Sequence, residues 1–217
     1  RRVRNLPQFS RTQVNSCEGL TRMEEVRFGT ELQNAYRELA HRYGPYLTTA
    51  ATLTLKKYAR IRVRRFENDS SDIYEFGQYL TDQTIRSTAH RFEERLTHYL
   101  YGNQSKHANK KHWAKPLLLV AIEGRKTHRR PHFHIAVGNI PVDKQASIDT
   151  LIAQAWHDCD FAHDEVRVEP LTNSFGWLNY MTKEVGYTDN DAFAVEHICI
   201  PEIIQQSICT EGRLLRG

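Results

Sequence analysis

The sequence predicts an α+β fold in which helices flank a central antiparallel sheet, and three observations carry this prediction. Residues 117–123 and 132–138 are apolar segments of strand length separated by only eight residues, which favours a β-hairpin. Residues 164–171 alternate valine with charged side chains, which is typical of a half-buried strand. The other apolar patterns have helical spacing, and strands interleaved with helices indicate a sheet covered mainly on one face.

The first half of the chain is expected to hold two helices and one strand. Residues 21–44 have helical spacing and run into a Gly-Pro pair that stops helices. Residues 48–58 are rich in threonine and leucine, which favours a strand. Apolar and aromatic residues recur along residues 72–101 until a Gly-Asn pair, so we expect one long helix there. A basic loop follows it.

The second half adds the hairpin, a strand and two further helices. Residues 142–159 carry isoleucine, leucine and alanine at helical spacing. Residues 173–186 are expected to form the last helix, with Asn173 or Ser174 as its N-cap and Gly186 as its end. The tail from Asp189 onward has a mixed pattern that predicts no single element.

Length and composition fit one globular domain with additions at both ends. The 217 residues are 40% hydrophobic and 26% charged, which excludes a disordered chain. We expect an N-terminal arm and helix, a central domain, and a C-terminal extension of unclear role, at residues 1–45, 46–188 and 189–217. The longest apolar run is Leu117–Ile122, so no membrane span is expected. The four cysteines form no CxxC pair, which indicates reduced thiols in an intracellular compartment.

Basic residues are clustered, although the net charge is only +4. Residues 56–65 contain six basic residues and no acid, residues 106–115 contain four lysines and two histidines, and residues 125–130 contain four basic residues. Such clusters are typical of surfaces that bind a phosphate backbone, although a solvated loop face is the alternative for any one of them. The candidate DNA-binding residues are Lys56, Lys57, Arg60, Arg62, Arg125, Lys126, Arg129 and Arg130.

Two histidines open the second strand of the expected hairpin. Because strand residues two apart project from the same face, His132 and His134 can share one divalent ion while Phe133 turns away. Glu123 ends the preceding strand, and its carboxylate can reach that face if the two strands pair. Two imidazoles and one carboxylate leave coordination positions open for a substrate oxygen. The sequence therefore predicts a catalytic metal site at these three residues.

A tyrosine and a lysine lie three residues apart on the last expected helix, at Tyr180 and Lys183. Three residues correspond to about 300° of helix, which puts both side chains on nearly the same face. Together with the threonine-rich strand at residues 52–55 and the His-Phe-His segment, this order of motifs resembles the HUH endonucleases. It is most similar to the rolling-circle replication initiators (Rep proteins) of plasmids, phages and small single-stranded DNA viruses. The resemblance spans residues 48–186, roughly two thirds of the chain.

The resemblance implies a ferredoxin-like or RRM-like HUH fold, with residues 46–188 as the endonuclease domain. It implies a nicking enzyme in which Tyr180 attacks the scissile phosphodiester of an origin and forms a transient 5′-phosphotyrosine bond. Lys183 would hold the phosphate or lower the pKa of the phenol. Mg2+ or Mn2+ would be the metal cofactor. Tyr187 follows the expected helix end at Gly186, so we expect a single catalytic tyrosine.

The same resemblance implies single-stranded DNA, such as an origin hairpin, as the partner. The sequence contains no GxxxxGK[ST] loop, so duplex opening would fall to a host helicase or to a part of the protein outside this sequence. A host polymerase would extend the free 3′ end. The location would be the cytoplasm of a bacterial host, or the nucleus if the protein came from a eukaryotic virus.

Other interpretations stay open at this point. Within HUH chemistry the alternatives are a single-strand transposase or a relaxase, although relaxases usually carry a third histidine and place the tyrosine near the N-terminus. From another class, an RRM-like binding module would need aromatic residues stacked on the sheet and would leave the acid and the histidines unexplained. Tyr180 could instead be an amphipathic core residue, and the two histidines could be exposed strand residues. A metal-dependent cleavage assay separates these classes.

Overall fold

In the computed structural model, which describes residues 22–67, 70–107 and 113–214, four strands form one antiparallel sheet in the order β4-β5-β1-β6. The strands are β1 (Leu47–Leu55), β4 (Leu117–Glu123), β5 (His132–Gly138) and β6 (Ala162–Pro170). The predicted α+β class with a central antiparallel sheet is therefore confirmed. The expected N-terminal arm and residues 108–112 of the expected basic loop lie outside the described residues.

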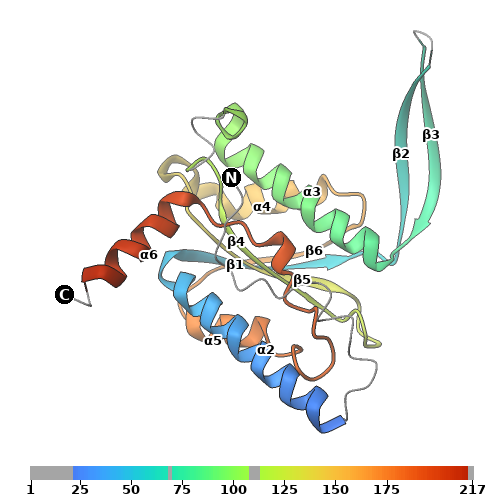
Figure 1. The fold of residues 1–217 in the computed structure, drawn as a ribbon. Helices are drawn as coiled ribbons and strands as arrows, with labels where there is room; N and C mark the ends of the chain where they lie inside the picture. The colour runs from blue at the N-terminus through green and yellow to red at the C-terminus, as the bar shows by residue number, and fades with distance from the viewer. Residues whose placement is uncertain (1–21, 68–69, 108–112, 215–217) are drawn as a thin grey trace.

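Two helices, α3 (Asp82–Tyr101) and α4 (Ile148–His157), pack on one face of this sheet (Figure 1). The order of these elements along the chain is β1, α3, β4, β5, α4 and β6. This is the β-α-β-β-α-β order of ferredoxin-like folds. Phe92 and Trp156 meet edge to face between the two helices, and Phe133 packs against the same indole. These fully buried aromatic side chains form the centre of the larger core cluster.

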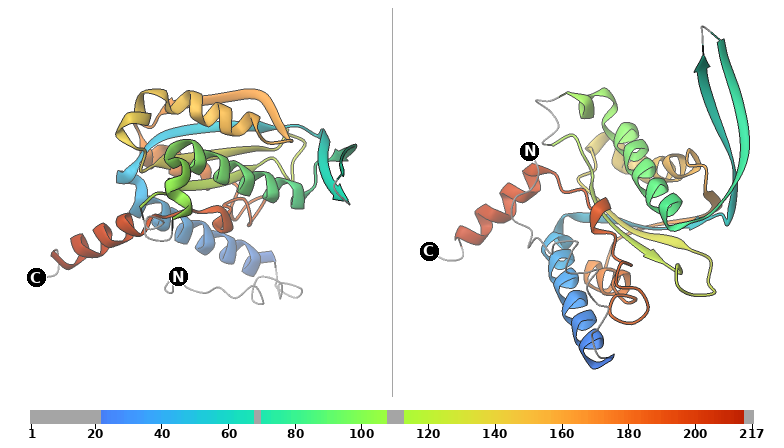
Figure 2. Two further views of the ribbon diagram at one scale, coloured as in Figure 1. Left: turned by 90° about the horizontal axis from the view of Figure 1, so that it is seen from above. Right: turned by 45° about the vertical axis from the view of Figure 1, so that its right-hand side comes forward.

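The opposite face is also covered over β4 and β5, so the cover of the sheet is less one-sided than the sequence predicts. Helices α2 (Arg22–Tyr43) and α5 (Ser174–Met181) lie on this side, and Figure 2 shows the sheet between the two pairs of helices. The reason lies in β4, whose seven residues are all buried. Because its side chains are apolar on both faces, both faces need cover.

The segment after α5 covers the outer edge of β4. Leu118 forms an antiparallel bridge with Cys199, and Ala121 forms one with Phe193. Phe193 is 1% exposed and belongs to the second core cluster. The segment continues through the short helix η4 (Val195–His197) into α6 (Glu202–Leu214). Residues on the far side of the expected boundary at 188/189 therefore help to build the core.

A two-stranded ribbon, β2 (Tyr58–Glu67) and β3 (Ser70–Tyr79), projects away from the body of the protein (Figures 1 and 2). The predicted single helix over residues 72–101 is therefore wrong in its first part. Apolar residues three and four apart imitate a helix here, but the chain pairs with the preceding basic segment instead. Helix α3 begins only at Asp82, where Thr81 accepts a hydrogen bond from the Thr84 backbone in a capping box.

The remaining elements differ from the sequence prediction mainly at their ends. Helix α4 is preceded by the 3-10 turn η3 (Val142–Ser147), and α5 ends at Met181 instead of Gly186. Two more short 3-10 turns are η1 (Gly44–Tyr46) and η2 (Gly102–Lys106). Among the described helices, none combines the length and the apolar character needed to cross a membrane.

Candidate metal and tyrosine site

The β4–β5 hairpin brings the three predicted metal ligands together. Its register pairs Glu123 directly with His132, and His134 follows on the same face. The Nε2 atom of His134 lies 2.9 Å from Glu123 Oε2 and 3.1 Å from His132 Nε2. One donor atom from each of the three side chains lies within 4.8 Å of the other two. The expected juxtaposition thus follows from hairpin register and strand alternation alone.

Hydrogen bonds on the far side of each ring orient the two imidazoles. His132 Nδ1 lies 2.9 Å from the Arg130 carbonyl oxygen, which can only accept, so this nitrogen carries the proton and donates. His132 Nε2 points toward Glu123, whose Oε2 lies 3.5 Å away, and it is the nitrogen that a metal would reach. His134 Nδ1 lies 3.1 Å from Thr52 Oγ1, a hydroxyl that can accept from an Nδ1 proton in the same way. Both rings can thus present a lone pair to a shared cation.

Positive charge surrounds the Glu123 carboxylate, which is 3% exposed. Lys183 Nζ lies 2.6 Å from Oε2, and Arg129 Nη1 lies 3.2 Å from Oε1. Burial by itself would raise the pKa of Glu123, but the hydrogen bond and positive charge of Lys183, with a further contribution from His134, outweigh burial and lower this pKa. Glu123 is therefore ionised at neutral pH, as a metal ligand must be.

Burial is also the main influence on His134. Together with repulsion from His132, it lowers the pKa of His134 to about 4, so this imidazole is neutral at physiological pH. A neutral imidazole is the form that binds a metal. One carboxylate and two imidazole nitrogens make a donor set that fits Mn2+ better than Mg2+, because Mg2+ prefers oxygen ligands. The residues present therefore fit a divalent ion.

Tyr180 and Lys183 reach this site from α5 and from the turn behind it. The Tyr180 ring packs against His134 with ring centroids 4.8 Å apart, and the residue is 42% exposed, so it borders both the site and solvent. The sequence predicts Lys183 on the same helix, but α5 ends at Met181 and Lys183 lies in the following turn. Its ammonium nevertheless lies over the Tyr180 ring, 3.3 Å from the centroid.

The early end of α5 has a local cause. Thr182 is fully buried, and its hydroxyl bonds back to the carbonyl oxygens of Leu178 and Asn179 at 3.2 Å each. A β-branched side chain that bonds its own helix backbone weakens helix continuation. Tyr187 follows in the turn region and is 81% exposed, away from the helical position that a second nucleophile would need.

Arg125 has partners other than the DNA that the sequence predicts for it. Its side chain is 3% exposed, and Nη2 lies 2.6 Å from Asp189 Oδ2, a carboxylate that is itself fully buried. Lys126 lies 3.1 Å from the other oxygen of Asp189, although its own side chain is 56% exposed. Arg125 therefore ties the loop after β4 to the C-terminal segment, and this ion pair leaves little of its side chain exposed for a DNA contact.

The other predicted DNA contacts fall into two groups. Arg129 and Arg130 are exposed beside the histidines, where Arg129 contacts Glu123 and Arg130 Nη1 lies 3.0 Å from His163 Nε2. The second group lies at the base and along the first strand of the projecting ribbon and comprises Lys56, Lys57, Arg60 and Arg62. Of these, all but the half-buried Lys56 are exposed.

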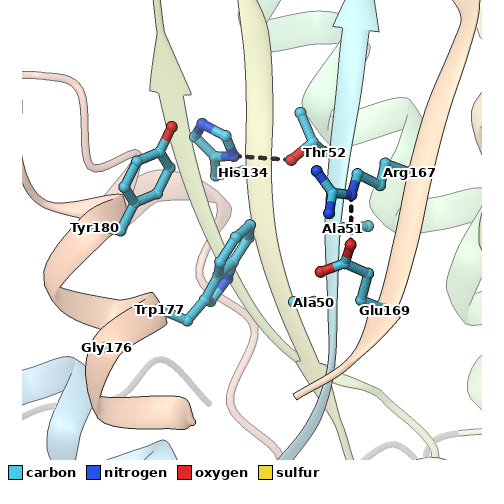
Figure 3. A pocket seen from close by; sticks show the side chains of 9 residues that line it. All are labelled: Ala50, Ala51, Thr52, His134, Arg167, Glu169, Gly176, Trp177 and Tyr180. Carbon is cyan, nitrogen blue, oxygen red and sulfur yellow. Dashed lines mark hydrogen bonds and ion pairs between the residues drawn. The ribbon is translucent and has the colours of Figure 1, made fainter. Parts of the chain in front are cut away.

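A hollow beside the histidines contains residues that the sequence did not single out. Figure 3 shows Trp177 on one side, the Arg167–Glu169 pair on the other, and Ala50 and Thr52 between them. Predicting this arrangement requires the register of β1 against β6, which pairs Thr52 with Arg167 and Ala50 with Glu169. The only signal in the sequence is the alternation in β6, which places arginine and glutamate on the face opposite the two valines.

Comparison with known proteins found no matching family model, no matching curated protein and no matching solved structure.

Proposed function

We propose that this protein is a metal-dependent single-strand DNA endonuclease and ligase of the HUH type, and that it acts as a rolling-circle replication initiator. One observation carries the proposal: the donor atoms of Glu123, His132 and His134 converge, and Tyr180 packs directly against one of these imidazoles. If Tyr180 were only a core residue, its packing against a histidine of this cluster would have no explanation. If the histidines were only exposed strand residues, the buried carboxylate of Glu123 beside them would have none. The sequence motifs and this geometry support the same chemistry.

Glu123, His132 and His134 would hold the divalent ion. When bound, the ion supplies positive charge that polarises a phosphodiester and offsets the charge that develops on its oxygens. The phenol oxygen of Tyr180 forms a bond to phosphorus, and the bond to the 3′ oxygen breaks. The phenol loses its proton and the departing 3′ oxygen gains one, which leaves a 5′-phosphotyrosine and a free 3′-hydroxyl.

Lys183 contributes to this step from its place over the Tyr180 ring. A phenol has an ordinary pKa near 10, so it is a weak nucleophile at neutral pH without help. The ammonium group over the Tyr180 ring would attract the phosphate and offset the negative charge that develops there. The same ammonium neutralises Glu123, so its position links the metal ligand to the nucleophile.

The test is covalent capture of DNA. Wild-type protein is incubated with a pool of single-stranded oligonucleotides and Mn2+, and the products are separated on a denaturing gel. We expect an SDS-resistant protein–DNA adduct that EDTA and Tyr180→Phe abolish, while Tyr187→Phe retains it because this exposed tyrosine lies in the turn region. An adduct that persists in Tyr180→Phe would refute the assigned nucleophile. Salt-sensitive binding without cleavage would favour the RRM-like binding module.

A further inference from the structure

The hollow beside the tyrosine has the volume of a small-molecule site. It has a volume of about 350 Å³, which lies within the range of about 300–1,000 Å³ found for small-molecule pockets. His134 and Tyr180 form part of its lining, so whatever binds there lies next to the proposed metal site and the proposed nucleophile. Figure 3 shows that the hollow extends from these residues across β1 toward β6.

Trp177 forms one wall and is held in a fixed orientation. Its Nε1 atom donates to the Ile135 carbonyl oxygen at 3.2 Å, which ties the indole to β5. Its ring also stacks on Tyr180, with centroids 5.8 Å apart and an interplanar angle of 26°. An indole fixed in this way, with one side toward the hollow, provides a stacking platform for a planar ring.

The opposite wall is an ion pair on β6. Arg167 uses Nε to bond one carboxylate oxygen of Glu169, and both side chains are substantially exposed, at 77% and 49%. Figure 3 shows the terminal guanidinium nitrogens and the second carboxylate oxygen of this pair turned toward the hollow. The wall therefore offers a cationic donor next to an anionic acceptor.

Ala50 makes the space between the two walls. It pairs with Glu169 on one side and with Ala136 on the other, and its side chain lies on the same sheet face as the histidines. Two adjacent alanines on this face leave room that larger strand residues would fill. The hollow is therefore a consequence of residue size at the middle of the sheet.

We propose that this hollow binds a guanine base that is turned out of the DNA strand next to the scissile phosphate. This inference rests on the proposed function, because it takes single-stranded DNA as the substrate. The Watson–Crick edge of guanine carries one acceptor, O6, followed by two donors, N1–H and N2–H. Arg167 would donate to O6, Glu169 would accept from the two donors, and Trp177 would stack on the ring. Among the four bases only guanine presents two donors to the carboxylate.

Selection of bound sequences tests the pocket without requiring cleavage. Tyr180→Phe protein is used to enrich a randomised single-stranded pool in EDTA, and the bound DNA is sequenced. We expect guanine to be enriched about tenfold or more at one position. In the same Tyr180→Phe background, Glu169→Gln should remove that preference, because an amide presents both a donor and an acceptor. Glu94→Gln, on the other side of the sheet, is the matched control and should retain it.

Cleavage sites then place the base relative to the reaction. If adducts form with wild-type protein, sequencing of the attached ends should show guanine beside the cut, and Ala50→Val should weaken this preference by filling the hollow. Adducts without any base preference at the cut would overturn the pocket while leaving the endonuclease intact. A Glu169-dependent guanine preference without adducts would support the pocket and overturn the nicking function. Equal guanine enrichment with and without the Glu169→Gln substitution would overturn the base assignment.

Discussion

Replacing Thr52 with valine should weaken metal binding without changing any metal ligand. The Thr52 hydroxyl lies 3.1 Å from His134 Nδ1, and His134 is only 4% exposed, so water cannot readily replace the lost partner. An unpaired buried N–H costs about 1–3 kcal/mol. The imidazole can avoid this cost by moving its proton to Nε2 and donating to Glu123 Oε2, 2.9 Å away. A metal would then have to displace that proton.

We therefore expect Thr52→Val to raise the Kd for Mn2+ by about 10- to 100-fold, the usual effect of losing a partner that orients a ligand. This corresponds to about 1.4–2.7 kcal/mol and is measurable by isothermal titration calorimetry at pH 7.5. Thr54→Val is the matched control, because Thr54 lies on the same face of β1 but its hydroxyl contacts Glu165 at 3.5 Å. Equal Mn2+ affinities for wild type and Thr52→Val, with unchanged thermal stability, would refute the orienting role.

Three further predictions concern charge. Lys183→Met should bind Mn2+ more tightly at pH 8, because the cation 2.6 Å from the Glu123 carboxylate is gone. The same variant should cleave DNA about 100-fold more slowly. Loss of both Mn2+ affinity and cleavage would contradict a competition between Lys183 and the metal for Glu123. Arg60→Ser combined with Arg62→Ser should make the slope of log Kobs against log salt shallower by about 1.4 for single-stranded DNA, because two phosphate contacts at about 0.7 each are lost. An unchanged slope would show that these two ribbon residues do not contact the DNA. Burial lowers the pKa of His197 to about 4, so the unfolded chain binds this proton more readily than the folded one. The contribution of His197 to the free energy of unfolding should therefore be complete above about pH 6.5 and decline by up to about 3 kcal/mol as the pH falls toward 4. In urea unfolding curves measured over this pH range, His197→Leu should reduce the decline. An unchanged decline would show that another group causes it.

The juxtaposition of the three candidate metal ligands could be predicted from sequence because the information is local. Side chains two apart on a strand share a face, and a hairpin with a connection of eight residues allows Glu123 to meet His132. Both statements depend only on neighbouring residues. The same holds for the N-cap of α5, where the Asn173 side chain accepts from the Gly176 backbone as expected.

The projecting ribbon could not be predicted because its pairing partner is outside the local pattern. Ile73 and Phe76 have helical spacing, and nothing within their own segment indicates that Phe76 pairs with Ile61 or Tyr74 with Val63. Tertiary pairing decides between helix and strand for such a segment. The burial of Arg125 could not be predicted for a related reason, since its buried partner Asp189 lies more than sixty residues along the chain.

The location of the site follows from where the cover of the sheet ends. Helices α2 and α5 pack over β4 and β5, where the residues on that face are Leu117, Leu119 and Ala136. On β1 the same face carries alanine and threonine, and on β6 it carries arginine and glutamate, so no apolar surface there requires a helix. Tyr180 and Trp177 lie at the boundary between the covered and the polar halves. The alternation that buries leucine on the opposite face of β1 thereby leaves a polar strip beside the histidines.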